Sequence, residues 1–322
     1  MINTFLYCVP CQVYPTLQND VYSCPSCKQL WTSEGGIIRA ERSAHTGLTA
    51  NSQIFFDKYN SVINDSVIHH SLWWERINTI NASDIINWCV PLLKPKVIIE
   101  LGCGDGSNLS ACWNAHNSLN HIIGCDVSLN ALINSSANLS RILTSSHCDI
   151  TLLHCDASAV PLPSGIADIV IMSNVLHHSS TYEPLTECAR LLRRGGILIF
   201  TDITNGNIAR NIMGSLFKIA PRSLRNLFSY DLLVDNQNPD IKLVRLNEAR
   251  SILMSNRMHT IVDFYRGLFL FILQLFCIII PFLPKIIPKP LWWTLSSIEH
   301  QLLTKTSIQP FASLYYSLYI KY

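Results

Sequence analysis

Charged side chains are scarce in this sequence. Asp, Glu, Lys and Arg make up 14% of the 322 residues, and the formal net charge is only +2. A protein that grips nucleic acid through its phosphates needs a concentrated basic surface, which this composition does not supply. No secretory signal pattern opens the chain, so a cytoplasmic location is predicted. Hydrophobic residues make up 48%, enough for a large core.

The glycine spacing of a dinucleotide site is also missing. Residues 97–101 are mostly β-branched or apolar and predict a buried strand, which breaks into Gly102, Gly104 and Gly106. A dinucleotide fingerprint needs G-x-G-x-x-G, but position 107 is Ser107. The turn therefore indicates a different adenosine-containing cofactor, and the alternative is a strand-to-helix turn that binds nothing.

Polar side chains follow the later predicted strands. Residues 121–125 end at Asp126, residues 150–154 precede Asp156, residues 167–172 precede Asn174, and residues 197–201 end at Asp202. In a parallel sheet the carboxyl ends of the strands share one edge, where ligands bind. A helix over 182–192 is expected before the last of these strands, with Gly195-Gly196 as its stop.

An acid directly before G-x-G-x-G, with these later acids, resembles motif I of the class I S-adenosylmethionine-dependent methyltransferases. The resemblance covers about residues 100–202 and is greatest to the quinone-ring and other small-molecule enzymes. It implies an α/β, Rossmann-like seven-stranded methyltransferase sheet whose last strand is antiparallel. Ser173-Asn174-Val175-Leu176 departs from the N-P-P-Y-type sequence of adenine-N6 methyltransferases, which disfavours that branch.

The resemblance also implies roles for individual residues. The cofactor would lie over the turn and the strand ends. Glu100 would face its amino group, Asp126 its ribose, Asp156 its adenine and Asn174 its methionine portion. The full set of cofactor-binding residues would be Glu100, Gly102, Cys103, Gly104, Gly106, Asp126, Val127, Asp156, Ala157 and Asn174. His177 and His178 follow the fourth strand, where the acceptor would meet the cofactor. Histidine suits a general base near neutral pH. His178 is the first candidate and His177 the second; the equal alternative is that both only shape the loop.

Four cysteines form a second motif near the start of the chain. Cys8, Cys11, Cys24 and Cys27 have the spacing C-x2-C-x12-C-x2-C, which predicts a closed, structural four-thiolate Zn2+ site. Two disulfides are the alternative. The segment resembles the zinc ribbons that precede some class I methyltransferases, including a ribosomal-RNA guanine methyltransferase.

The predicted organisation has three parts. Residues 1–42 form the zinc ribbon, residues 43–95 a linker and helical cover with a helix over 64–88, and residues 96–322 the methyltransferase domain. An apolar helical insertion is expected at about 267–304. Its run 267–284 is just long enough to be a transmembrane candidate. A single span there would separate strands 258–265 and 311–320 of one sheet, so a membrane-surface helix or a lid is favoured over a buried helix or a span.

These patterns predict a methyltransferase that acts on oxygen or carbon of an apolar or lipid-linked small molecule by in-line methyl transfer. Its partners would be that acceptor and, through residues 267–284, a membrane surface, so it would be cytoplasmic or peripheral on a membrane. The first alternative is an RNA base methyltransferase, of the rRNA guanine type, whose ribbon binds RNA. The second is a non-enzymatic binding module.

Overall fold

The structure is a computed structural model that describes residues 5–40, 82–115, 119–142, 148–203, 244–266, 294, 298, 301–302 and 314–322. The predicted linker, most of the predicted helix 64–88 and the apolar run 267–284 lie outside these residues. Within the described ranges no helix is long and apolar enough to cross a membrane.

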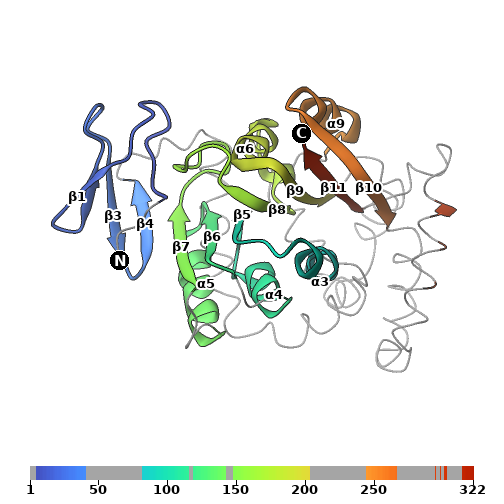
Figure 1. Cartoon of the computed structure of the whole chain (residues 1–322), viewed down its shortest axis with the longest axis horizontal. Helices are drawn as coiled ribbons and strands as arrows, with labels where there is room; N and C mark the ends of the chain where they lie inside the picture. Colours follow the sequence, from blue (N-terminus) through green and yellow to red (C-terminus); the bar gives the residue numbers. More distant parts are fainter. Residues whose placement is uncertain are drawn as a thin grey trace, which may run out of the picture.

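A sheet of seven strands forms the centre of the large domain (Figure 1). Its order is β7-β6-β5-β8-β9-β11-β10, and β11 runs antiparallel to both of its neighbours. The other neighbouring pairs are parallel. The strands are β5 (Val97–Leu101), β6 (His121–Asp126), β7 (Asp149–His154), β8 (Ala167–Ser173), β9 (Leu192–Ile203), β10 (Met258–Arg266) and β11 (Leu314–Lys321). This order confirms the predicted Rossmann-like methyltransferase sheet.

Alternating side chains of the strands build a core on each face of this sheet. On one face, residues such as Ile98 and Ile122 pack with α3 (Ala82–Leu93), α4 (Ser107–Ala115) and α5 (Leu129–Ile142). On the other face, their neighbours Ile99 and Ile123 share a buried cluster with α6 (Glu183–Leu191) and α9 (Leu246–Ser255). Figure 1 shows the two helical layers on either side. Adjacent strand residues point to opposite faces, so a strand covered on both faces is apolar throughout.

The ribbon continues the same sheet. Strands β1 (Thr16–Gln18), β2 (Val21–Ser23), β3 (Leu30–Glu34) and β4 (Ile37–Ala40) pair in an antiparallel series. Then β4 pairs in parallel with β7, with Ile37 opposite Leu152 and Arg39 opposite His154. Without β4, the backbone groups of β7 would form an open edge. The four ribbon strands and the seven strands of the large domain therefore form one continuous sheet.

The predicted helix 182–192 is present as α6, but Gly195-Gly196 do not form its stop. Helix α6 ends at Leu191, and both glycines lie within β9, which begins at Leu192. Leu192 already has extended backbone angles and pairs with Ala167 of β8. The strand thus begins before the glycines, because Leu192 pairs with β8 and is already extended, so the chain leaves the helix before it reaches Gly195.

Candidate functional site

The glycine turn joins β5 to α4 at the carboxyl edge of the sheet. Gly102 has φ +71°, and a Cβ atom there would overlap the side chain of Val175. Gly104 also has positive φ, +53°, but a Cβ atom there would meet nothing within 4 Å. Gly102 is therefore required by the packing of the chain itself, whereas Gly104 borders open space that a ligand can enter.

Glu100 lies below this turn with its carboxyl group buried. Its Oε1 accepts a hydrogen bond from Asn108 Nδ2 at 2.7 Å, while Oε2 has no hydrogen-bond partner among the described residues. Burial raises the pKa of Glu100 well above its ordinary value, against the opposing effect of the Asn108 hydrogen bond. A buried carboxyl oxygen without a donor fits a site that receives an amino group or a water molecule.

Asp126 connects the ends of β5 and β6. Its Oδ2 accepts from the backbone N–H of Gly104 and its Oδ1 from that of Ser128, each at 2.8 Å. A carboxylate has about four acceptor positions, so one side chain can bind several donors at once. The next residue, Val127, has its carbonyl oxygen 2.9 Å from His154 Nε2.

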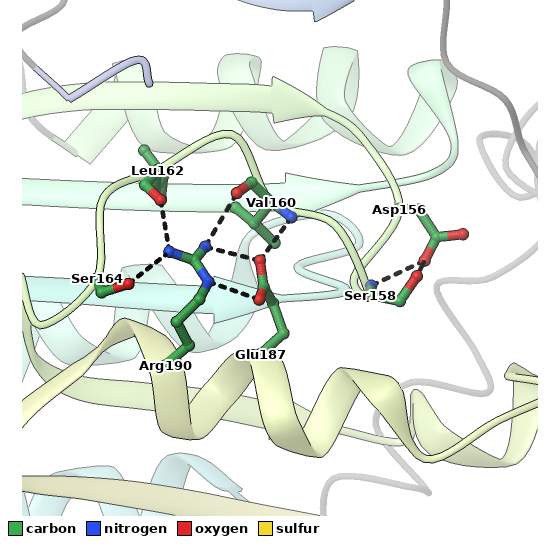
Figure 2. Close-up of polar contacts among 7 residues, drawn as sticks. All are labelled: Asp156, Ser158, Val160, Leu162, Ser164, Glu187 and Arg190. Atoms are coloured by element: carbon green, nitrogen blue, oxygen red, sulfur yellow. Dashed lines mark hydrogen bonds and ion pairs between the residues drawn. The ribbon is translucent and has the colours of Figure 1, made fainter. Parts of the chain in front are cut away.

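Asp156 begins the loop that follows β7. Its Oδ1 accepts from both the backbone N–H and the hydroxyl of Ser158 at 2.8 Å (Figure 2). Beyond Ser158, two side chains of α6 hold the loop. Glu187 Oε1 accepts from the backbone N–H of Val160 at 2.8 Å. Arg190 donates to the carbonyl oxygens of Leu162 at 2.7 Å and Val160 at 3.1 Å.

Neither Glu187 nor Arg190 stands out in the sequence as part of a site. In the sequence, Arg190 is recognisable only as a cation in the last turn of a predicted helix, and Glu187 lies one turn earlier. Their two ionic contacts with each other, both at 2.7 Å, would have been consistent with an ordinary helix pair. Their role in holding a loop more than twenty residues away is visible only in the folded chain.

The histidine pair lies in a short helix, Leu176–His178, just past the end of β8. His177 Nδ1 is 2.6 Å from Asp202 Oδ1, and the other carboxylate oxygen accepts from the backbone N–H of Leu176 at 2.8 Å. The His178 ring lies 3.8 Å from that of His177 between centroids. Burial, with the neighbouring His177, lowers the pKa of His178 well below 6.5. His178 is therefore neutral near pH 7.

Asn174 lies between β8 and this helix in the left-handed region, with φ +57°. Its backbone N–H donates to the carbonyl oxygen of Thr201 at 2.9 Å, and the residue is exposed. Cys103 is buried beneath the glycine turn, while Ala157 is partly buried next to Asp156. The predicted residues thus lie at the carboxyl ends of successive strands, and a direct hydrogen bond joins Gly104 to Asp126.

The four ribbon cysteines converge. Their sulfur atoms all lie within 4.8 Å of one another, and Cys8 Sγ is 3.6 Å from Cys27 Sγ. Zinc–sulfur bonds of about 2.3 Å in a tetrahedron place sulfurs roughly 3.8 Å apart, so the cluster fits Zn2+. All four thiols are free, which does not support the two-disulfide alternative. Burial opposes ionisation of Cys24, but backbone N–H groups of Cys27 and Ser26 lower its pKa to about 6.

Comparison with known proteins agrees with this geometry. Residues 99–200 match a family model described as a methyltransferase domain. The mouse (Mus musculus) tRNA (carboxymethyluridine(34)-5-O)-methyltransferase ALKBH8 is 33% identical over 143 residues, which cover 43% of this chain and 18% of that protein. The chain therefore spans less than a fifth of the length of this relative.

Two solved structures share the fold. Magnesium protoporphyrin IX methyltransferase from Synechocystis PCC 6803, with bound S-adenosylhomocysteine, has a TM-score of 0.53 and 13% identity, covering 85% of this chain and all of that one. Geranyl diphosphate C-methyltransferase from Streptomyces coelicolor A3(2) has a TM-score of 0.53 and 10% identity, covering 87% of this chain and all of that one. At these identities, the likeness concerns the fold.

Proposed function

We propose that this chain, which carries a class I S-adenosylmethionine-dependent methyltransferase domain, methylates an oxygen or carbon atom of an apolar or lipid-linked small molecule. One observation carries the proposal. The open space at Gly104 lies at the same sheet edge as the buried His177–Asp202 pair. The buried Oε2 of Glu100, which has no hydrogen-bond partner in the described part of the chain, lies there too. The edge thus combines an open approach to the backbone of Gly104 with an imidazole that can accept a proton.

Each part of the edge has a binding task in this proposal. Asp126 accepts from the ribose hydroxyls, and Val127 lies beside it. Asp156 accepts from the adenine amino group through the oxygen that Ser158 does not use, while the backbone of Ala157 meets the ring. Glu100 orients the cofactor's amino group, the backbone of residues 102–106 forms the floor, and Asn174 borders the methionine portion. When bound, the cofactor supplies a methyl group on a good leaving group, so holding the acceptor in line is the main requirement.

A hydroxyl or acidic carbon acceptor must also lose a proton. Asp202 holds His177 in one orientation, which keeps Nδ1 protonated and leaves Nε2 as the acceptor. The sequence favours His178, but the contact with Asp202 supports His177 as the first candidate for the base. His178 is neutral because its pKa is lowered, so it remains the second candidate.

The alternative acceptor is RNA. It is supported by the mouse relative, whose name records a tRNA methyltransferase. The low net charge of +2 and the 14% of charged residues favour the small molecule instead.

A labelled methyl group separates the two acceptors. The purified chain is incubated with methyl-labelled S-adenosylmethionine and either a lipid extract or total RNA from the same cells. We expect label in the lipid extract, and a loss of labelling in the Asp126→Ala variant. Label confined to RNA would replace the small-molecule proposal by the RNA alternative. If calorimetry detected no binding of S-adenosylhomocysteine, both acceptor proposals would be wrong.

A further inference from the structure

The loop after β7, residues 155–165, is held from two sides. One side is α6, where Glu187 and Arg190 bind the backbone of Val160 and Leu162 (Figure 2). This is the loop that begins with Asp156, the residue that we place beside adenine. A loop with so many of its backbone groups bound holds its first residues in a defined position.

The other side of the loop is the ribbon. The backbone N–H of Tyr7 donates to the carbonyl oxygen of Pro161 at 2.9 Å. Leu6 and Trp31 of the ribbon are buried in the same apolar cluster as Val160 and Leu162. The loop therefore packs between α6 and the ribbon, and ribbon atoms complete both its hydrogen bonding and its core.

The ribbon also aligns the strand that leads into this loop. Arg39 of β4 lies opposite His154, the last residue of β7, in the parallel pairing. His154 in turn contacts the carbonyl oxygen of Val127, beside Asp126, at 2.9 Å. The register of β4 on β7 is thus connected to the residues that we place at both adenine and ribose.

We infer that the ribbon is a positioning module for the adenine end of the cofactor site, so that metal in the ribbon and cofactor in the large domain bind cooperatively. Tyr7 directly precedes Cys8, one of the four clustered cysteines, so closing the metal site fixes the N–H that holds Pro161. Metal ligation joins the turn that carries Cys8 and Cys11 to the turn that carries Cys24 and Cys27, so the metal stabilises the ribbon. Loss of the metal would loosen Tyr7 and the ribbon strands, and would weaken the support of the loop after β7. This inference rests on the proposed function.

Linkage between the two sites is measured with zinc and S-adenosylhomocysteine. Affinity for S-adenosylhomocysteine is compared by calorimetry before and after zinc is removed by a chelator, with circular dichroism to confirm that the large domain stays folded. We expect a loss of about tenfold or more. Saturating S-adenosylhomocysteine should strengthen zinc binding by the same factor, because coupling is reciprocal. S-inosylhomocysteine, which lacks the adenine amino group, should show a smaller factor.

Two variants keep the test valid if the metal-free chain unfolds. In the zinc-loaded protein, Tyr7→Pro removes the backbone N–H that donates to the carbonyl oxygen of Pro161. Tyr7→Ala removes the side chain but keeps this N–H. We expect Tyr7→Pro to bind S-adenosylhomocysteine about fivefold more weakly than Tyr7→Ala, the effect of one lost hydrogen bond, at equal zinc content.

Equal affinities in the two Tyr7 variants, or unchanged affinity in a folded metal-free chain, would overturn the inference and leave the proposed function intact. A zinc-loaded wild-type chain that binds no S-adenosylhomocysteine would overturn both.

Discussion

Two histidine–aspartate pairs occupy very different environments in the described part of this chain. His177 and Asp202 are 2.6 Å apart, and their side chains are 4% and 0% exposed. His121 and Asp149 are 3.6 Å apart, with side chains 24% and 49% exposed. At the scale of single residues, only the His177–Asp202 pair is sufficiently shielded from water for the carboxylate to hold the imidazole in one orientation.

This contrast gives a matched prediction for catalysis. Asp202→Asn should lower kcat by about 10²- to 10⁴-fold, because an amide does not hold the Nδ1–H of His177 as a carboxylate does. Affinity for S-adenosylhomocysteine should change by less than about threefold, since Asp202 is not among the residues that we place at the cofactor. Steady-state kinetics with the labelled acceptor fraction measures the first effect and calorimetry the second. Asp149→Asn is the control; equal rates in the two variants would remove His177 as the base.

Two glycines with positive φ and open surroundings allow the cofactor floor to be tested. Gly104 and Gly165 have φ values of +53° and +73°, and a Cβ atom at either meets nothing within 4 Å. Changing either to Ala should cost about 1 kcal/mol of unfolding free energy. Only Gly104→Ala should also weaken S-adenosylhomocysteine binding, by about tenfold or more, because its methyl group enters the cofactor space. Calorimetry and urea unfolding measure the two effects; unchanged binding in Gly104→Ala would contradict the floor assignment.

Glu100 predicts how cofactor affinity depends on pH. Its pKa is raised by burial, so the free protein keeps the carboxyl neutral above the ordinary value of 4.5. A bound ammonium group favours the carboxylate, and binding therefore releases a proton. Affinity for S-adenosylhomocysteine should therefore rise with pH below the raised pKa of Glu100 and become constant above it. Calorimetry in buffers of different ionisation enthalpy counts the proton, and Glu100→Gln should abolish its release.

At the scale of elements, one carboxylate connects α9, β10 and β11. Asp263 of β10 accepts from Arg250 of α9 at 2.7 Å, and from Tyr315 and Ser317 of β11 at 2.6 Å each. Tyr315 and Ser317 are fully buried. The antiparallel last strand is therefore joined to its helix through side chains as well as through the backbone ladder.

Removing this carboxylate should loosen the edge of the sheet. Asp263→Ala removes an acceptor that Tyr315, Ser317 and Arg250 share, although each keeps a second partner in Tyr319, Val262 and Tyr265 respectively. We expect a loss of about 1–2 kcal/mol in urea unfolding. Glu248→Ala breaks an exposed ion pair with Arg245 on the same helix and should cause no measurable change. A similar midpoint for both variants would show that the Asp263 contacts contribute little.

At the scale of the whole molecule, the apolar run 267–284 predicts association with a membrane surface. The wild-type chain should sediment with anionic liposomes, and replacing Phe271 and Phe276 by Glu should abolish this, because the charged side chains disfavour entry into the acyl region. Ile133→Glu, on the exposed face of α5, is the control and should sediment as wild type does. If the wild-type chain stayed in the supernatant, membrane association would be excluded, and a lid or a buried helix would remain as the interpretation of residues 267–284.

Much of the fold was predictable because its signals are local. The run that ends at Glu100 and the glycines identified the central strand and its turn, and the acids after the later strands marked one edge of a parallel sheet. The cysteine spacing likewise predicted a cluster that the folded chain brings together. Apolar periodicity, turn residues and ligand spacing are properties of adjacent residues, so a single sequence expresses them directly.

Tertiary structure decided what joins these parts. The pairing of β4 with β7, the hold of Glu187 and Arg190 on the loop after Asp156, and the contact of Asp202 with His177 each connect residues that lie far apart in the chain. A carboxylate or a guanidinium in the sequence shows its charge but not its partner, because the partner is chosen by packing. Local patterns in the sequence were enough to predict the central sheet and the convergence of the four cysteines. Only folding shows that His177 is the histidine beside Asp202 and that the ribbon contacts the loop after β7.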